Sequence, residues 1–220
     1  MEVPAKMLQN PAPILMPPLG GGDLILASGS RFRRQMLEAA GLQFQVQTAT
    51  VDETAERSMM TRDNPAIEPA EVAMRLAARK AREISGRNPE ALVIGADQVL
   101  ALDRKIYGKP ADVRAARAQL LGLRGRTHTL PTAVVLVRGG AVLWEHLGIA
   151  ELKMRMFSDE FLGAYLRAAS GQLTETVGGY ALEGLGSQLF ERIEGDYFTI
   201  IGLPLIPLLA ELRRQGVIMA

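Results

Sequence analysis

The chain enters its folded part through Leu24-Ile25-Leu26-Ala27-Ser28-Gly29-Ser30-Arg31-Phe32-Arg33-Arg34. The four apolar residues predict a short buried strand, the Ser-Gly-Ser run predicts a turn, and a helix over residues 32–40 should end at Gly41. Backbone N–H groups at a helix start, serine hydroxyls and guanidinium groups together favour phosphate binding. Because Phe32 adds one aromatic ring, the stretch predicts a ligand with both phosphate and a flat base, which is a nucleotide.

The three arginines that open this helix allow other interpretations. Cations in a first helical turn oppose the helix dipole at a cost of roughly a few tenths of a kcal/mol, which a bound anion or a cluster of surface salt bridges would offset. A nucleic-acid-binding arm is a third interpretation. It is disfavoured by the balance of 25 basic and 24 acidic residues, a formal net charge of +1.

Length and composition bound the fold and its setting. A chain of 220 residues that is 48% hydrophobic can bury one substantial core. The absence of cysteine excludes disulfides, thiol catalysis and cysteine-based zinc sites, and it suits a reducing, cytoplasmic location. No segment is long and apolar enough to predict a membrane span or a membrane partner. Five prolines and one lysine in residues 1–22 predict a flexible N-terminal extension rather than a signal peptide, before a single domain over residues 23–220.

Apolar patterning places the remaining elements. Residues 43–48, 91–95, 99–102, 105–107, 132–137, 141–144, 176–182 and 188–193 favour strands, and residues 68–84, 111–121, 158–169 and 204–215 favour helices. Residues 49–65 are expected to form a polar loop. Strands and helices alternate irregularly, with some hairpins, which predicts an α/β fold with a mixed central sheet and flanking helices.

Two acidic sites could carry chemistry. Asp97 stands where a fully apolar strand ends, the place where ligands bind in open α/β sheets, and a partly desolvated carboxylate there could act as a general base or metal ligand. Asp52 and Glu53 could join it in binding Mg²⁺ or Mn²⁺, which prefer oxygen ligands. The simpler alternatives are a turn aspartate at Asp97 and a solvated acidic loop at Asp52 and Glu53.

Basic residues supply the second half of a candidate site. Lys80 shares one helical stripe with Val72, Leu76 and Ile84, so its ammonium group either snorkels to solvent or points into a cleft. Lys109 follows a glycine in a turn and could neutralise phosphate. His128, one of two histidines, is expected to be structural.

Nine short motifs occur in an order that resembles the Maf family of nucleoside triphosphate pyrophosphatases, over residues 23–216. The motifs are Leu26-Ala27-Ser28-Gly29-Ser30 with Arg33, Val51-Asp52-Glu53, Leu76-Ala77-Ala78-Arg79-Lys80-Ala81, Gly95-Ala96-Asp97, Gly108-Lys109-Pro110, Gly125-Arg126-Thr127-His128, Gly178-Gly179-Tyr180, Glu183-Gly184 and Gly202-Leu203-Pro204-Leu205. The resemblance implies two α/β lobes around a deep cleft, often in a dimer. It implies hydrolysis of the α–β phosphate bond of a nucleoside triphosphate, with a divalent metal, Mg²⁺ or Mn²⁺, as cofactor.

The resemblance also assigns residues. Asp97 matches the catalytic base, and Glu53, Lys80 and Lys109 match the other charged catalytic residues. Asp97 and Glu53 are the expected metal ligands. On the same ground the substrate is expected to contact a second set: Ser28, Ser30, Phe32, Arg33, Gln98 and Glu183.

Three positions bear on the base. The dTTP/UTP subgroup of the family carries Arg, Thr and Gln where this chain has Phe32, Gln98 and Glu183, which resemble the 7-methyl-GTP subgroup. A methylated guanine is cationic, stacks on an aromatic ring and donates hydrogen bonds to a carboxylate. The family usually has Pro at Arg31 and Trp at Phe32. The alternatives are a dTTP/UTP enzyme and a non-catalytic nucleotide-binding regulator of cell division.

Overall fold

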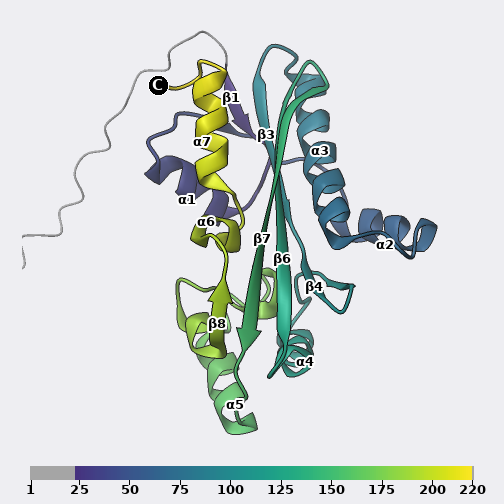
Figure 1. The fold of residues 1–220 in the computed structure, drawn as a ribbon, viewed down its shortest axis with the longest axis vertical. Coiled ribbons are helices and arrows are strands. Elements are labelled where there is room, and N and C mark those ends of the chain that lie inside the picture. The colour runs from purple at the N-terminus through teal and green to yellow at the C-terminus, as the bar shows by residue number, and fades with distance from the viewer. Residues whose placement is uncertain (1–22, 220) are drawn as a thin grey trace, which may run out of the picture.

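The computed structural model describes residues 23–219, so the flexible extension expected over residues 1–22 lies outside the described residues. An eight-stranded mixed sheet runs through the protein with strand order β2-β1-β3-β6-β4-β5, while β7 pairs with β6 and β8. Helices flank this sheet on both sides (Figure 1). The predicted α/β class with a mixed central sheet is therefore confirmed.

The elements follow the chain in an irregular alternation. The strands are β1 Leu24–Leu26, β2 Gln45–Val46, β3 Leu92–Gln98, β4 Leu100–Leu102, β5 Lys105–Tyr107, β6 Thr127–Arg138, β7 Ala141–Met154 and β8 Phe190–Glu194. The α-helices are α1 Arg31–Ala39, α2 Glu53–Asp63, α3 Pro69–Arg87, α4 Val113–Leu123, α5 Asp159–Ala168, α6 Tyr197–Ile201 and α7 Leu205–Arg214. Strand β1 pairs parallel with β2 and β3, whereas β3 pairs antiparallel with β6.

Alternating side chains divide the sheet between two cores. Ile25, Val93 and Val135, on β1, β3 and β6, face α3. The residues immediately before and after each of them in its strand face the opposite side, where α1 and α7 pack. This period of two is what a strand covered on both faces requires. A third core fills the other end of the molecule under α4 and α5 (Figure 1).

The β6–β7 hairpin is the longest pairing in the sheet. Gly139 and Gly140 make its two-residue turn with φ of +54° and +79°, a conformation that the twist of a tight hairpin requires and that residues with side chains disfavour. The predicted hairpin is confirmed, but both strands extend much further than predicted, to Thr127 in β6 and to Met154 in β7.

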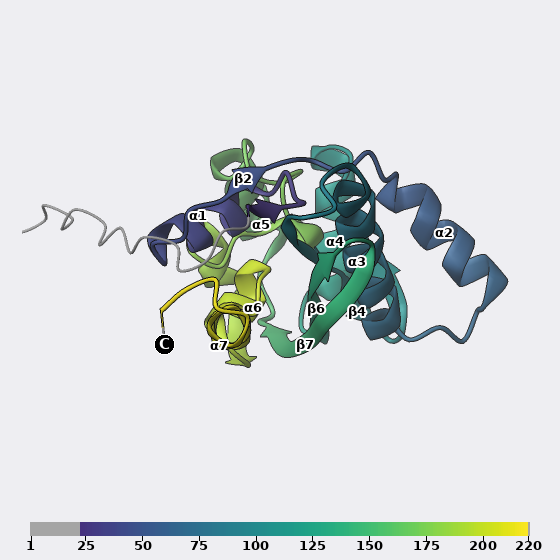
Figure 2. The same ribbon diagram turned by 90° about the horizontal axis from the view of Figure 1, so that it is seen from above.

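Two expectations for local structure are wrong, and one short helix is missing from the predicted elements. Residues 53–63 form helix α2 instead of a loop, and Asp52 caps this helix by accepting from the N–H groups of Thr54 and Ala55. None of its residues is fully buried, so the sequence has no apolar stripe that would predict the helix. In Figure 2 this helix stands away from the sheet. Residues 177–179 form a 3-10 turn instead of a strand because two consecutive glycines adopt positive φ. Helix α6 is absent from the predicted elements, since five residues are too few for a helical period.

Candidate active site

The close approach of α3 to β3 builds the core of the site. A Cβ atom on Gly95 would lie 2.3 Å from the carbonyl oxygen of Ala77 and 2.7 Å from the Cβ of Ala81, so only glycine allows this packing. The same approach brings Lys80, on the buried face of α3, beside Asp97 near the end of β3. The lysine therefore points inward rather than snorkelling to solvent, and it is 5% exposed.

Lys80 bridges two carboxylates. Its Nζ donates to Oδ1 of Asp97 at 2.7 Å and to Oε1 of Glu53 at 3.0 Å. The Asp97 side chain is nearly inaccessible, whereas that of Glu53 is 39% exposed at the start of α2. Oδ2 of Asp97 is buried and has no hydrogen-bond partner within residues 23–219. One oxygen of the buried carboxylate is thus held and the other is free.

Burial and charge act differently on the two carboxylates. Burial raises the pKa of Asp97, against the attraction of Lys80, and the neighbouring Glu53 charge raises it further. For Glu53, burial also raises the pKa, but the charge and hydrogen bond of Lys80, with help from Arg33 and Lys109, bring it below its ordinary value. Two adjacent carboxylates whose pKa values move apart are suited to different roles, the more basic one to accept a proton.

Arg33 links the turn after β1 to the end of β3. Its Nη1 donates to the Ser28 hydroxyl at 3.0 Å and to the Ala96 carbonyl at 2.9 Å, and its Nε donates to the Gly202 carbonyl at 2.8 Å. Burial lowers the pKa of this guanidinium, while the Asp97 and Glu53 charges oppose the shift. The guanidinium-rich turn and the acid of the central strand thus lie together. No described residue accepts a hydrogen bond from Nη2.

The other polar groups of the first turn are engaged within the protein. Ser30 is the N-cap of α1 and accepts from the N–H of Arg33, while Ser28 accepts from the N–H of Ser30. Arg31 pairs with Glu175 at 2.8 Å and Arg34 pairs with Glu38 at 2.7 Å. Protein carboxylates therefore offset the helix dipole here, as the salt-bridge alternative predicts, and the cost argument for a bound anion at this turn does not hold.

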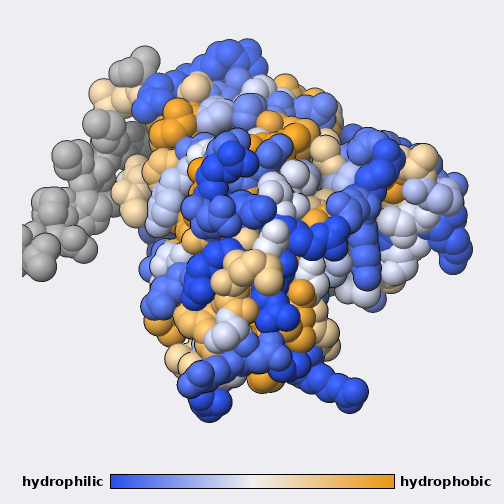
Figure 3. Space-filling view, turned by 60° about the horizontal axis from the view of Figure 1, so that its bottom comes forward, coloured by the Kyte–Doolittle hydropathy of each residue, from blue (hydrophilic) through white to orange (hydrophobic). Residues whose placement is uncertain are grey.

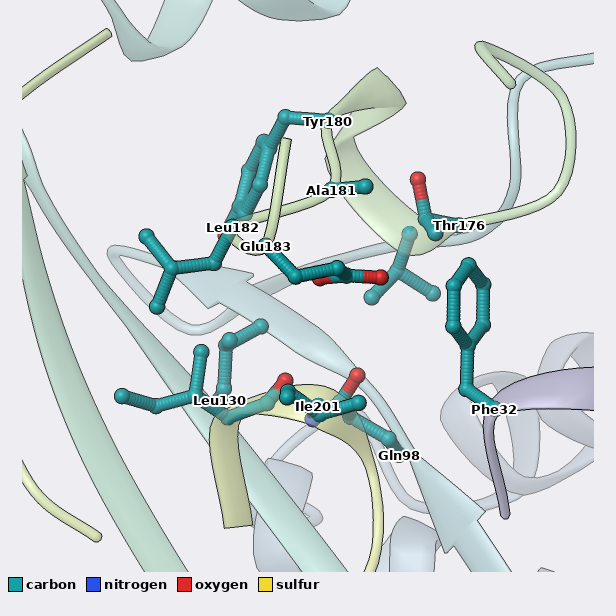
Figure 4. Close-up of a pocket in the computed structure, with 11 residues that line it drawn as sticks. Phe32, Gln98, Leu130, Thr176, Tyr180, Ala181, Leu182, Glu183 and Ile201 are labelled. Atoms are coloured by element: carbon teal, nitrogen blue, oxygen red, sulfur yellow. Dashed lines mark hydrogen bonds between the residues drawn. The ribbon is translucent and has the colours of Figure 1, made fainter. Parts of the chain in front are cut away.

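A narrow pocket is lined in part by Gln98, the residue that follows Asp97 in the chain. Its lining includes Phe32, Gln98 and Glu183, three residues that the sequence places far apart. In Figure 4 Glu183 and Gln98 lie on opposite sides of the pocket and Phe32 stands at one end. The Arg31 guanidinium lies 4.7 Å from the centroid of the Phe32 ring, so one aromatic face already carries a cation.

Sequence reasoning misses two groups of this pocket, Thr176 and Tyr180. Oγ1 of Thr176 is buried without a partner among the described residues, and the hydroxyl of Tyr180 lies 2.7 Å from Nε2 of His128. Because the sequence pattern predicts a strand where the Gly-Gly turn lies, it does not predict that these two side chains line one pocket. As expected, His128 is structural in its setting: it is buried against Tyr180 and Phe190, and burial lowers its pKa to about 4.

Two further candidates lie at the margin. Lys109 is exposed in the turn after β5, and its charge reaches Glu53 strongly enough to lower that pKa. Asp52 uses a carboxylate oxygen to cap α2, so its position fits a structural cap. Within residues 23–219 no three acidic or histidine side chains gather around one point.

A scan of protein families finds a match to a family described as Maf-like protein, over residues 23–215. The chain belongs to the Maf family. The resemblance drawn from the nine motifs is confirmed.

Curated relatives of this Maf protein include a 7-methyl-GTP pyrophosphatase of Mesorhizobium japonicum, 52% identical over 89% of this chain and 97% of its own length. Another 7-methyl-GTP pyrophosphatase, from Rhizobium etli, is 49% identical over the same shares. A nucleoside triphosphate pyrophosphatase of Paramagnetospirillum magneticum is 52% identical over 87% of this chain and 98% of its own. Among solved structures, a Neisseria meningitidis lipoprotein aligns at a TM-score of 0.26 with 16% identity, covering 71% of this chain and all of that one, too weak to bear on the fold.

On the face drawn in Figure 3 hydrophilic residues dominate and apolar residues occur in small groups. In the part of the chain that the structure describes, no helix has the length and hydropathy to cross a bilayer.

Proposed function

We propose that this Maf protein hydrolyses the α–β phosphate bond of a nucleoside triphosphate, giving a nucleoside monophosphate and pyrophosphate, and that 7-methyl-GTP is its preferred substrate. The observation that carries the proposal is the buried Lys80–Asp97 pair, joined through the next residue, Gln98, to a pocket that Phe32 and Glu183 also line. Relatives named 7-methyl-GTP pyrophosphatase align over almost their whole length and support the same activity.

The free oxygen of Asp97 supplies the base. Because burial raises the Asp97 pKa, Oδ2 can accept a proton from a water molecule more readily than an ordinary aspartate could. Lys80 stabilises the ionised state through Oδ1 and keeps the carboxylate oriented. Arg33, whose Nη2 has no partner within residues 23–219, and Lys109 contribute positive charge for the triphosphate, which we place in a cleft between the two ends of the sheet.

The donor set fits a divalent metal ion. Glu53 is a half-exposed carboxylate that would hold the ion, and the Asp97 carboxylate, joined to it through Lys80, would be the second ligand. Mg²⁺ is commonly held by one or two carboxylates while phosphates and water fill its other positions, so the lack of a third acidic ligand among residues 23–219 is compatible with it. When bound, Mg²⁺ or Mn²⁺ would neutralise charge on the phosphates.

Base selection rests on Phe32 and Glu183. The cationic 7-methylguanine ring is suited to stack on Phe32, and the Glu183 carboxylate can accept from its N–H groups while offsetting its charge. No partner chain is needed for these contacts, and a homodimer stays a prediction from the family. Homologous residues of the UTP-type subgroup would lack both features.

A panel of triphosphates with pyrophosphate detection tests the proposal. We expect the highest kcat/KM for 7-methyl-GTP, against GTP, UTP, dTTP and ATP. Hydrolysis in ¹⁸O-labelled water identifies the phosphorus atom that water attacks, since attack on the α-phosphorus puts the label in the monophosphate. Preference for UTP or dTTP would overturn the base assignment, and release of orthophosphate with a nucleoside diphosphate would overturn the bond assignment.

A further inference from the structure

The Gln98 side chain is held from three directions. Its Nε2 donates to Oγ1 of Thr132 at 2.9 Å and to the carbonyl oxygens of Thr199 and Ile200 at 3.0 and 3.1 Å. Thr132 stands directly opposite Gln98 in the β3–β6 register and is fully buried. The two carbonyls belong to α6, which is fixed at its start by the Asp196 cap. An exposed glutamine would lack all three contacts.

The chemistry of these partners determines which way the amide points. Backbone carbonyls can only accept hydrogen bonds, so the atom facing them must be the NH₂ group. Thr132 has a single hydroxyl proton, which it donates to the Thr199 carbonyl at 3.0 Å, so a lone pair faces Gln98. A flipped amide would place its oxygen against two carbonyl oxygens. The orientation therefore follows from the partners themselves.

The consequence is that Oε1 of Gln98 is left as an open acceptor. Within residues 23–219 no donor reaches it, and Gln98 lines the same pocket as Glu183. Figure 4 places these two side chains on facing sides. Both side chains thus offer the pocket acceptors. Guanine presents an N–H and an exocyclic NH₂ along one edge, whereas uracil presents one N–H between two carbonyl oxygens.

We infer that Thr132 is a positioning residue for base selection: with α6 it locks the Gln98 amide so that its oxygen accepts from the donor edge of a guanine-type base. This inference rests on the proposed function and deepens it. Thr132 does not touch the reacting atoms. Its effect is expected in the selectivity between bases rather than in the rate of the bound complex.

The test compares Thr132→Val with Thr132→Ser and Thr129→Val. Valine matches threonine in shape but lacks the hydroxyl, so the Gln98 amide loses the one of its three acceptors that lies on β6 and is held only by the two α6 carbonyls. We expect the ratio of kcat/KM for 7-methyl-GTP over UTP to fall about tenfold, through the KM for 7-methyl-GTP at unchanged kcat, as the loss of one hydrogen bond predicts. Serine should restore the ratio. The hydroxyl of Thr129, on the same strand, contacts the Ala101 carbonyl instead and should be dispensable.

Each outcome separates this inference from the proposed function. If the wild-type protein prefers UTP, the proposed function fails and the inference fails with it. If the wild-type protein prefers 7-methyl-GTP and Thr132→Val keeps the full ratio, the inference alone is overturned. A Thr132→Val protein that loses kcat equally on all bases would also overturn it, because that result describes a damaged fold. Its melting temperature, compared with that of Thr132→Ser, identifies this case.

Discussion

Replacing Lys80 by methionine tests whether the buried pair is organised as described. The methionine side chain would fill the same channel without a charge, leaving Asp97 buried opposite an apolar group. Lys80 Nζ lies 2.7 Å from Asp97, and both side chains are below 10% exposed, at 7% and 4%. Two charges at about 4 Å attract by about 4 kcal/mol at an effective dielectric of 20. Removing one partner of a buried pair costs about 3–5 kcal/mol.

We therefore expect Lys80→Met to lower the free energy of unfolding by about 3–5 kcal/mol at neutral pH. For a chain of this size the melting temperature should fall by roughly 6–20 °C. Urea denaturation at about pH 8 and pH 5 is the assay. Arg34→Met is the matched control, since Arg34 and Glu38 are also 2.7 Å apart but exposed, and such pairs contribute about 0–1 kcal/mol.

The pH dependence has a definite sign. Because folding raises the Asp97 pKa, the protonated carboxyl is favoured in the folded protein, and its contribution to stability is lost as pH rises through that value. Without Lys80 the Asp97 pKa should rise further, so the penalty should be smaller at pH 5 than at pH 8. Asp97→Asn in the Lys80→Met background should recover most of the loss. Equal losses at both pH values, with no coupling between the two positions, would refute the reasoning.

Three further predictions concern single side chains. Phe32→Ala should raise KM for 7-methyl-GTP about tenfold if stacking contributes ~1–2 kcal/mol, with a smaller change for UTP; steady-state kinetics on both bases checks this, and equal losses contradict stacking. Glu183→Gln should reduce the preference for 7-methyl-GTP over uncharged bases, and unchanged selectivity would remove Glu183 from base binding. Burial lowers the pKa of His128 to about 4, so stability from its neutral ring is present above about pH 6.5 and lost as pH falls toward 4. Between about pH 7.5 and pH 5 the free energy of unfolding should fall by about 2 kcal/mol less in His128→Phe than in the wild-type protein. Denaturant titration at the two pH values measures this, and an equal fall in both proteins would contradict it.

The spacing of apolar residues along the chain predicts the helices and strands that bury one or both faces. The stripe through Leu76 and Lys80 predicts α3 and leaves two directions for the lysine, which its two carboxylate partners decide. The run before Asp97 predicts a buried strand and an acid near its end. In both cases the signal comes from residues that bury side chains against a neighbour.

Contacts made by backbone atoms, and helices too short or too exposed to show an apolar period, are not predicted from the sequence. Carbonyl oxygens of α6 accept from Gln98, and that of Gly202, which ends the helix, accepts from Arg33. Every residue has a backbone carbonyl, so the residue types do not indicate which carbonyls make such contacts. The only local signals of α6 are an N-cap at Asp196 and the left-handed Gly202 after five residues. Helix α2 has a cap at Asp52 but no fully buried residue, so it lacks the apolar period that would predict it. The sequence does not predict that Glu175, distant from Arg31 along the chain, pairs with it, so the arginines of the first turn do not by themselves require a bound phosphate.

The most direct test of the central claim is pyrophosphate release from 7-methyl-GTP by Asp97→Asn, beside Asp52→Asn as the matched control. The account predicts that Asp97→Asn loses about 10²–10⁴-fold in kcat while still binding the nucleotide, because the base is gone and the pocket is intact. Asp52→Asn keeps the α2 cap and should stay active. Near-normal turnover by Asp97→Asn would contradict the assignment of the buried carboxylate as the group that accepts the proton.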